Sequence, residues 1–429
     1  MKTTIEKLGE GLMNYKITVF GLGFVGLTTA LAFAEKGHTV HGYDVNVQRT
    51  ELLNSGKLPF VEPGLDDALL RHINNKFSIT TDVITSVKES DFIFLCVGTP
   101  QGENGEADLK YIFSAIDTFS PILNDSKYRT VVIKSTIPPS TTAERIVPYF
   151  SSKDLLPGKE FSIANNPEFL REGKCWEDMM NADRIVCGVA DSRGEEMLKS
   201  LYRSFDSPFF GVSLNTGEYI KYLSNTLLAT MISYANEMSK VADAIGGIQI
   251  KEAFEILHMD RRWGGASMAS YVYPGCGYGG YCLPKDTQAM YAKSLSKGYA
   301  PEILKHVIEV NDTMPEFMVD RIMKVAKETD SIGILGLSFK PGSDDVRDSS
   351  SAKIIKSLMA SNYKNINVFD PVANKAFASE YDLSINYYDT LDEICTESTV
   401  LVLVTAWDEF AAVNKKYPLK TFVDCRYYL

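Results

Sequence analysis

The sequence predicts an α/β fold in which two doubly wound domains are joined by a long central helix. Two apolar strands that each end in a glycine turn, near residues 21 and 336, predict the two domains. Apolar residues recur at helical spacing over residues 215–247, and this pattern predicts the helix. We expect four regions: an N-terminal extension (1–14), a first nucleotide-binding domain (15–210), a central helical region (211–310) and a second nucleotide-binding domain (311–429).

The first domain begins with the apolar strand KITVFG, and the motif GLGFVG starts where this strand ends. An alanine-rich helix follows, and the next strand, HTVHGYD, ends on Asp44. Gly21, Gly23 and Gly26 allow a tight turn that brings the backbone close to a pyrophosphate, whose charge the helix N-terminus stabilises. A glycine turn in a non-binding domain is the alternative, but the strand, helix and acidic residue together favour a Rossmann-like nucleotide site.

The residue at the end of the second strand bears on the choice of cofactor. Asp44 is placed to accept hydrogen bonds from the adenosine ribose, and its charge would repel a 2′-phosphate. The sequence therefore predicts NAD rather than NADP. Two further strands, within 91–100 and 130–138, end in threonine-bearing loops at the carboxyl edge of the sheet, where ligands of open α/β folds bind.

The strand pattern returns in the C-terminal part of the chain. SIGILGLSF (331–339) ends in a glycine turn, NINVFD ends on Asp370, and TVLVLVTAW (399–407) is a further strand. The turn reads GLSFKPGSDDVR instead of GxGxxG, and it carries Lys340 and Arg347. These positive charges suit a phosphate-bearing ligand, although solvated loop charges are the commoner explanation for any single lysine or arginine.

The central helix is expected to end at Gly246 and Gly247. Its apolar face is broader than a bridge between two domains requires, so we expect it to serve a homodimer as well. Lys221 and Asn225 are four residues apart and share one face of this helix. Taken by itself, that polar pair is more simply explained as a solvated surface.

One cysteine, Cys282, lies in the unusual stretch GYGGYCLPKD (277–286). The glycines allow close approach or positive φ angles. Lys285 and Asp286 bring one positive and one negative group near the thiol, and such groups shift thiol pKa values. This pattern predicts a thiol in a loop that meets a ligand.

Composition excludes several classes of protein. The net charge of −11 and a pI near 5.1 argue against non-specific binding to nucleic acid. No apolar run reaches the roughly 18 residues that a membrane helix needs, and the N-terminus lacks the apolar centre of a signal peptide. The seven scattered cysteines include no CxxC pair and have no neighbouring histidines, so we expect free thiols in the cytoplasm and no metal site.

Four motifs follow GLGFVG in order: NNPEFLREG (165–173), KYLSN (221–225), GYGGYCLPKD (277–286) and GLSFKPGSDDVRDS (336–349). Together they closely resemble the UDP-glucose 6-dehydrogenase family, within the wider UDP-glucose/GDP-mannose dehydrogenases, over roughly residues 15–429. The tyrosine before Cys282 is similar to the members that oxidise UDP-glucose, whereas members acting on N-acetylated sugars tend to carry GGHC.

The resemblance implies a four-electron oxidation, in which the C6 hydroxyl of UDP-glucose becomes the carboxylate of UDP-glucuronate with two NAD and one water. Cys282 would attack the intermediate aldehyde as a thiolate, giving a thiohemiacetal and then a thioester that water hydrolyses. Glu168 and Asp286 would handle protons and the hydrolytic water. Lys221 and Asn225 would stabilise the oxyanions.

The resemblance also implies the remaining contacts. Thr136 would hydrogen-bond an active-site water. The cofactor would meet Gly21, Gly23, Gly26, Asp44, Arg49, Thr99, Thr136, Glu172 and Arg347. The sugar nucleotide would meet Phe169, Leu170, Glu172, Lys221, Asn225, Tyr271, Gly277, Gly279 and Lys340.

The sequence departs from the family pattern just before the cysteine motif. An Arg-Ile-Gly is usual there, and its arginine often reaches the substrate of the neighbouring subunit. Here the segment reads DRRWGGASMAS, so either Arg261 or Arg262 would take that role, and about four extra residues precede Tyr271.

Two other functions compete with this interpretation. One is a dehydrogenase of another nucleotide sugar, such as a UDP-N-acetylhexosamine or GDP-mannose. The other is a nucleotide-sugar-binding protein without catalysis, which the joint presence of Cys282, Lys221, Asp286 and Glu168 disfavours. A two-electron dehydrogenase of the 6-phosphogluconate type would need neither the cysteine motif nor the second nucleotide domain.

Overall fold

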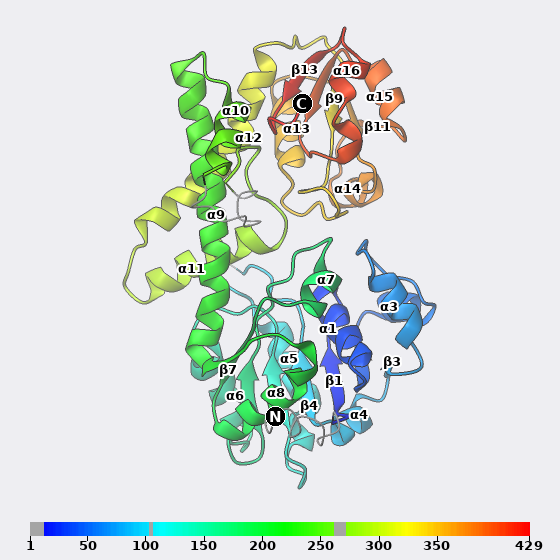
Figure 1. Ribbon diagram of the computed structural model, residues 1–429, viewed down its shortest axis with the longest axis vertical. Helices are drawn as coiled ribbons and strands as arrows, with labels where there is room; N and C mark the ends of the chain where they lie inside the picture. Colours follow the sequence, from blue (N-terminus) through cyan, green and yellow to red (C-terminus); the bar gives the residue numbers. More distant parts are fainter. Residues whose placement is uncertain (1–12, 103–105, 261–271) are drawn as a thin grey trace, which may run out of the picture. The chain divides into compact units, whose positions relative to one another are not determined.

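The computed structural model describes residues 13–102, 106–260 and 272–429. The chain forms two compact units, residues 1–222 and 223–429, and the boundary between them falls inside the long helix α9 (Leu214–Ile245). This helix confirms the predicted central helix to within a few residues (Figure 1). Each unit contains one sheet with helices packed against it, which confirms the predicted α/β fold.

The N-terminal unit is built on an eight-stranded sheet in the order β3-β2-β1-β4-β5-β6-β7-β8. Every neighbouring pair is parallel except β6 and β7. The strands are β1 (Lys16–Phe20), β2 (Thr39–Tyr43), β3 (Phe77–Ile79), β4 (Phe92–Leu95), β5 (Thr130–Ile133), β6 (Ser162–Asn165), β7 (Ile185–Val189) and β8 (Phe209–Ser213).

Helices bury both faces of this sheet, so its strands are apolar on both sides. In β1, Ile17 and Val19 pack into the core on one face, and Phe20 packs into the core on the other. The α-helices of this unit that precede α9 are α1 (Phe24–Glu35), α2 (Val47–Asn54), α3 (Leu65–His72), α4 (Val83–Glu89), α5 (Lys110–Phe119), α6 (Val147–Ser151), α7 (Cys175–Met180) and α8 (Ser192–Tyr202).

The C-terminal unit has a five-stranded parallel sheet in the order β11-β10-β9-β12-β13. Its strands are β9 (Ile332–Leu335), β10 (Ile366–Phe369), β11 (Asn386–Tyr387), β12 (Val400–Leu403) and β13 (Thr421–Asp424). After α9 its helices are α10 (Ile250–His258), α11 (Cys282–Ser296), α12 (Glu302–Met323), α13 (Ser350–Ala360), α14 (Asn374–Glu380), α15 (Leu391–Glu397) and α16 (Val413–Lys416).

The strand order reverses between β1 and β4 in the first sheet and between β9 and β12 in the second. Ligands of open α/β sheets bind at such switch points, beyond the carboxyl ends of the strands. The predicted glycine turn after β1 and the turn carrying Lys340 after β9 both start at these points. Within the described residues, no helix is long and apolar enough to cross a membrane.

Candidate active site

Each of the three glycines of GLGFVG is explained by its own surroundings in the structure. A Cβ on Gly21, whose φ is +87°, would lie 2.7 Å from the carbonyl oxygen of Cys96, and one on Gly26 would lie 1.8 Å from the oxygen of Gly21. These two residues close the turn and pack α1 against the sheet. A Cβ on Gly23 would meet nothing within 4 Å. Gly23 is the N-cap of α1, so open space lies where a pyrophosphate would approach the helix N-terminus, and the turn fits a dinucleotide.

Asp44 follows β2 and holds the same turn. Its Oδ2 accepts hydrogen bonds from the backbone N–H of Leu22 at 2.7 Å and from Nη1 of Arg49 at 2.9 Å. The Asp44 side chain is 5% exposed and that of Arg49 is 34% exposed. The structure therefore brings two of the predicted cofactor residues into contact beside the glycine turn.

We expect the charge of Asp44 to set the preference for NAD over NADP. In Asp44→Asn, the amide oxygen can still accept from Leu22, while the charge that repels a 2′-phosphate is lost and Arg49 loses its partner. The ratio of kcat/KM for NAD to that for NADP should fall by about tenfold, equivalent to about 1.4 kcal/mol. Steady-state kinetics with both cofactors measure it. Equal use of NADP by the unchanged protein would contradict this role.

Glu168 and Lys221 form a buried ion pair, with 2.8 Å between Oε1 and Nζ. The other oxygen of Glu168 accepts from the backbone N–H of Leu170 at 2.6 Å. Burial opposes ionisation of Glu168, but the charge and hydrogen bond of Lys221 outweigh it, so the pKa of Glu168 is lowered. The carboxylate is thus held ionised, as a group that accepts protons must be.

The start of α9 is fixed against the sheet, and this places Lys221. A Cβ on Gly217 would lie 2.3 Å from Oδ1 of Asn165 and 2.8 Å from the Cα of Gly188, so only glycine allows this close packing. The amide of Asn165 also donates to the carbonyl oxygen of Leu214 at 2.9 Å. Lys221 follows one helical turn later.

Phe169, a predicted sugar contact, has two cations near its ring. The ammonium of Lys221 is 5.6 Å from its ring centroid and the guanidinium of Arg184 is 4.3 Å away. The sequence analysis did not identify Arg184, because no recognisable motif surrounds it. Glu172 is half-buried in the turn before α7, a few residues further along the same segment.

The two threonine-bearing loops meet at the carboxyl edge of the first sheet. Oγ1 of Thr99, which is 4% exposed, donates to the carbonyl oxygen of Thr136 at 2.8 Å. Thr136 itself is half-buried. These loops follow β4 and β5, next to the switch point, as a cofactor role for both residues requires.

Glu218, one turn before Lys221 on α9, is a second residue that sequence reasoning missed. It is 3% exposed, and its Oε1 accepts from the backbone N–H of Thr142 at 2.8 Å and from Oγ1 of Thr142 at 2.6 Å. Burial raises the pKa of Glu218 to about 7, although the hydrogen bonds from Thr142 partly oppose the shift.

This shift predicts how stability depends on pH. The pKa of Glu218 is raised above its ordinary value of 4.5. The contribution of Glu218 to the free energy of unfolding is therefore fully present below pH 4.5 and is lost as pH rises through 7. Between pH 5 and 8 the free energy of unfolding of the N-terminal unit should fall by about 2.5 kcal/mol relative to Glu218→Gln, which does not titrate. Urea unfolding of both proteins across this range tests it. Parallel pH dependences would show that Glu218 does not titrate there.

All seven cysteines are free thiols, and Cys282 alone among them is exposed. The structure corrects the predicted loop, because Cys282 is the first residue of helix α11. Pro284 is compatible with this, since the first turn of a helix has N–H groups without intrahelical partners. The N-terminal end of a helix stabilises negative charge, which suits a group that reacts as a thiolate.

Asp286 lies one turn after Cys282 and is held from two sides. Its Oδ2 accepts from the amide of Asn225 at 2.7 Å, and its Oδ1 accepts from the ammonium of Lys285. All three side chains are buried. Burial opposes the charge of Lys285, but Asp286 outweighs it and raises the pKa of Lys285. The C-terminal unit therefore brings Asn225 of α9 to Lys285 and Asp286 in the first turns of α11, the helix that begins with Cys282.

The glycines before Cys282 pack against the unit's own chain. A Cβ on Gly277 (φ +94°) would lie 2.6 Å from Oδ1 of Asn311, one on Gly279 would lie 2.5 Å from the carbonyl oxygen of Asp348, and one on Gly280 would meet the ring of Phe339. This packing is sufficient reason for glycine, so close approach to a ligand is not needed to explain it. The sugar contacts assigned to Gly277 and Gly279 stay predictions.

The same packing joins the cysteine motif to the turn after β9. The N–H of Gly280 donates to the carbonyl oxygen of Arg347 at 2.9 Å, and the Arg347 guanidinium lies 4.4 Å from the ring centroid of Tyr281. Arg347 also forms an ion pair with Asp345 at 2.6 Å. Lys340 is half-buried beside Phe339, with its ammonium 5.4 Å from the ring centroid. The motifs at 277–286 and 336–349 are thus neighbours in space.

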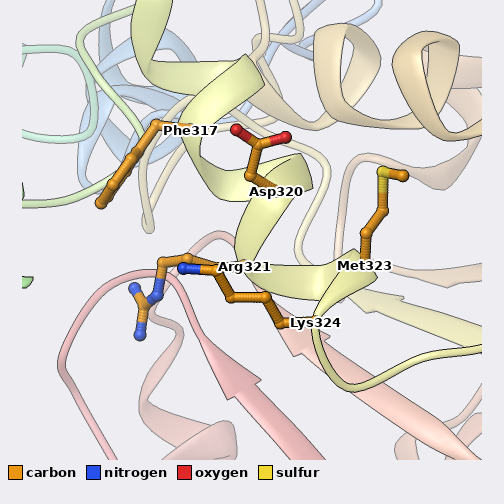
Figure 2. Close-up of a pocket in the computed structure, with 5 residues that line it drawn as sticks. All are labelled: Phe317, Asp320, Arg321, Met323 and Lys324. Carbon is orange, nitrogen blue, oxygen red and sulfur yellow. The ribbon is translucent and has the colours of Figure 1, made fainter.

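Three predicted residues, Tyr271, Arg261 and Arg262, lie outside the described residues, as does the insertion between them. A pocket of about 350 Å³ elsewhere in the C-terminal unit contains none of the predicted site residues. Figure 2 shows its lining side chains, which come from α12 and from the residue directly after it: Phe317, Asp320, Arg321, Met323 and Lys324.

The first sheet, with its glycine turn and Asp44, defines the class: a dehydrogenase-type nucleotide-binding protein with a second nucleotide-binding sheet. Comparison with known families gives the particular family. The chain belongs to the UDP-glucose/GDP-mannose dehydrogenase family, because residues 15–206 match its NAD binding domain, 215–313 its central domain and 333–429 its UDP binding domain. It is an NAD-binding enzyme of that family.

Individual relatives support the same family assignment. The chain is 36% identical to UDP-glucose 6-dehydrogenase from Rickettsia felis, over 93% of this chain and 88% of the relative. It is 31% identical to GDP-mannose 6-dehydrogenase from Pseudomonas savastanoi, over 94% of each chain. A solved UDP-glucose dehydrogenase from Pyrobaculum islandicum has a TM-score of 0.89 and 34% identity, covering 98% of this chain and 96% of its own.

Proposed function

We propose that this protein oxidises C6 of UDP-glucose to the carboxylate of UDP-glucuronate, with two NAD and one water consumed for each sugar. The observation that carries the proposal is the environment of Cys282. It is the exposed cysteine of the chain, it begins helix α11, and a buried, doubly held Asp286 follows one turn later. A two-electron alcohol dehydrogenase has no use for such a thiol, whereas a four-electron oxidation needs a nucleophile that traps the aldehyde.

NAD, when bound, accepts one hydride in each of the two oxidation steps. Gly21, Gly23 and Gly26 would hold its pyrophosphate, and Asp44 with Arg49 would hold the adenosine ribose. In the first step the C6 alcohol loses a hydride and its hydroxyl proton, leaving an aldehyde. The thiolate of Cys282 then adds to the aldehyde carbon, and the carbonyl oxygen takes up a proton to become the hydroxyl of the thiohemiacetal. Loss of a second hydride and a proton leaves a thioester.

Water completes the reaction by attacking the thioester carbon. The C–S bond breaks, Cys282 is released, and the sugar leaves as a carboxylate. Glu168 is suited to take a proton from this water because its own carboxyl is held ionised. The buried ammonium of Lys221 is suited to stabilise negative charge on oxygen. Asn225 would assist Lys221 and keep Asp286 in place.

The test is a panel of nucleotide sugars with NAD, in which NADH is counted for each sugar consumed. UDP-glucose should give two NADH per sugar and the highest kcat/KM. GDP-mannose and UDP-N-acetylhexosamines belong in the panel because one relative is named a GDP-mannose 6-dehydrogenase and a solved structure that is 27% identical to this chain is a UDP-D-ManNAc dehydrogenase. Preference for one of these would transfer the proposal to that sugar, and one NADH per sugar would refute the four-electron reaction.

Because the seven cysteines are free thiols, we propose that the reaction takes place in the cytoplasm.

We further propose that the protein forms a homodimer through α9. Tyr219, Leu223, Leu227 and Tyr234 follow one face of this helix and are about half exposed. A row of large apolar side chains on one helix face is typical of a protein–protein interface. Sedimentation should show a dimer at micromolar concentration, and Leu223→Glu with Leu227→Glu should convert it to a monomer. A monomer of the unchanged protein would refute the proposal.

A further inference from the structure

Lys134, directly after β5, is a buried cation to which the proposed reaction gives no role. It is 3% exposed, and its ammonium donates to Oδ1 of Asn166 at 2.9 Å and to the carbonyl oxygen of Asn166 at 3.4 Å. A buried lysine is costly unless its charge is compensated. Asn166 and the titratable groups that act on Lys134 define its surroundings.

Four titratable groups act electrostatically on Lys134: Cys96 after β4, Glu168 after β6, Cys187 in β7 and Lys221 in α9. A fifth, Tyr202 in α8, donates to the same oxygen of Asn166 as Lys134 does. Burial raises the pKa of both thiols to about 12. Burial likewise raises the pKa of Tyr202 far above its usual range. These three groups are therefore neutral near pH 7, and Glu168 is the anion of the cluster. Lys134 and Lys221 thus both act on the Glu168 carboxylate.

The same lysine also fixes the backbone that carries Glu168. Asn166 is fully engaged: its Oδ1 accepts from Lys134 and from the hydroxyl of Tyr202 at 2.5 Å, and its amide donates to the carbonyl oxygen of Val186 at 2.8 Å. Its backbone N–H donates to the carbonyl oxygen of Ile133 at 2.9 Å. Asn166 is two residues before Glu168, so this network fixes where the segment leaves the sheet.

We propose that Lys134 is a positioning residue for Glu168, which holds the 166–170 segment through Asn166 and adds a second positive charge to the field of the Glu168 carboxylate. This role rests on the proposed function only in that Glu168 there takes the proton of water. Burial lowers the pKa of Lys134, and its interactions with Cys96 and then with Glu168 partly oppose that shift, while Lys134 in turn lowers the pKa of Glu168. Each charge therefore supports the ionised form of the other.

Two substitutions remove the field of Lys134 in different ways. Lys134→Met removes the charge and keeps the length of the side chain. Asn166→Asp keeps the shape of Asn166 and places a carboxylate against the ammonium, which neutralises it, and it also loses the hydrogen bond that the amide donates to the carbonyl oxygen of Val186. Tyr202→Phe is the matched control, because it removes the other hydrogen bond to the same oxygen of Asn166 and leaves the charge unchanged. Asn166→Asp also covers the case in which Lys134→Met does not fold.

The readout is the titration of Glu168 itself, followed by carbon-13 NMR of protein labelled at glutamate carboxyl carbons and assigned with Glu168→Gln. We expect Lys134→Met and Asn166→Asp to raise the midpoint of the Glu168 titration by about one pH unit or more. Tyr202→Phe should leave this midpoint near that of the unchanged protein. The acid limb of kcat/KM for UDP-glucose should move in parallel. Unchanged midpoints in both charge variants would overturn the proposal, as would an equal shift in Tyr202→Phe. The NMR titration needs no substrate, so it is independent of whether the proposed reaction is correct.

Discussion

Replacing Cys282 with serine is expected to lower steady turnover by several orders of magnitude, while NAD and the sugar nucleotide still bind. The hydroxyl is a poorer nucleophile than the thiolate, and an oxygen ester is hydrolysed more slowly than a thioester. The substitution is nearly isosteric at an exposed position, so the packing of α11 should survive. A slowly hydrolysed sugar–enzyme adduct should therefore accumulate, and intact-protein mass spectrometry should detect it.

Cys276→Ser is the matched control for this experiment. Cys276 is six residues earlier and 2% exposed, and its sulfur faces the carbonyl oxygens of Cys425 and Val404 at 3.6 and 3.9 Å. It packs inside the C-terminal unit, so its replacement should leave turnover largely intact at some cost in stability. If Cys282→Ser still formed two NADH per sugar at a near-normal rate, the thioester mechanism would be wrong.

The parts of the fold that were predictable from sequence have local causes. The turn after β1 needs glycine at Gly21 because of its positive φ, and at Gly26 because of the contact with Gly21. Helix α9 is long enough for its apolar periodicity to be unambiguous, so its ends were predicted to within a few residues. In both cases the signal lies within one stretch of the chain.

The cysteine motif was harder because two physical causes leave the same sequence signal. Glycine is needed wherever something comes close, whether that is a ligand or the chain itself, and here Phe339, Asp348 and Asn311 come close. Proline is typical of loops, yet it is also tolerated in the first turn of a helix, where Pro284 lies. Nothing local separates these alternatives.

Residues that act through distant partners could not be predicted. Lys134 and Asn166 are 32 residues apart, and Glu218 and Thr142 are 76 residues apart. A single lysine after a strand, or a single glutamate on a helix, is usually a solvated charge. Only the folded sheet shows that these two are buried, and burial is what gives each its shifted pKa.

The second large effect is expected from Lys221→Met, which should lower turnover by about 10²- to 10⁴-fold by removing the charge that stabilises the oxyanions. It should also lower the free energy of unfolding by about 3 kcal/mol or more, since breaking a buried pair leaves an uncompensated charge on Glu168. A loss of turnover alone would therefore not separate a catalytic lysine from a structural one.

The double variant Lys221→Met with Glu168→Gln makes that separation. It removes both charges of the pair, so no carboxylate is left buried opposite the lost ammonium, and most of the lost stability should return. Turnover should stay as low as in the single variant or fall further, because both the oxyanion stabiliser and the proton acceptor are then missing. Urea unfolding and NADH formation on the same preparations measure the two quantities side by side. If turnover recovered together with stability, the ion pair would serve only to fix α9 against the 165–170 segment, and the chemistry would have to be assigned to other residues.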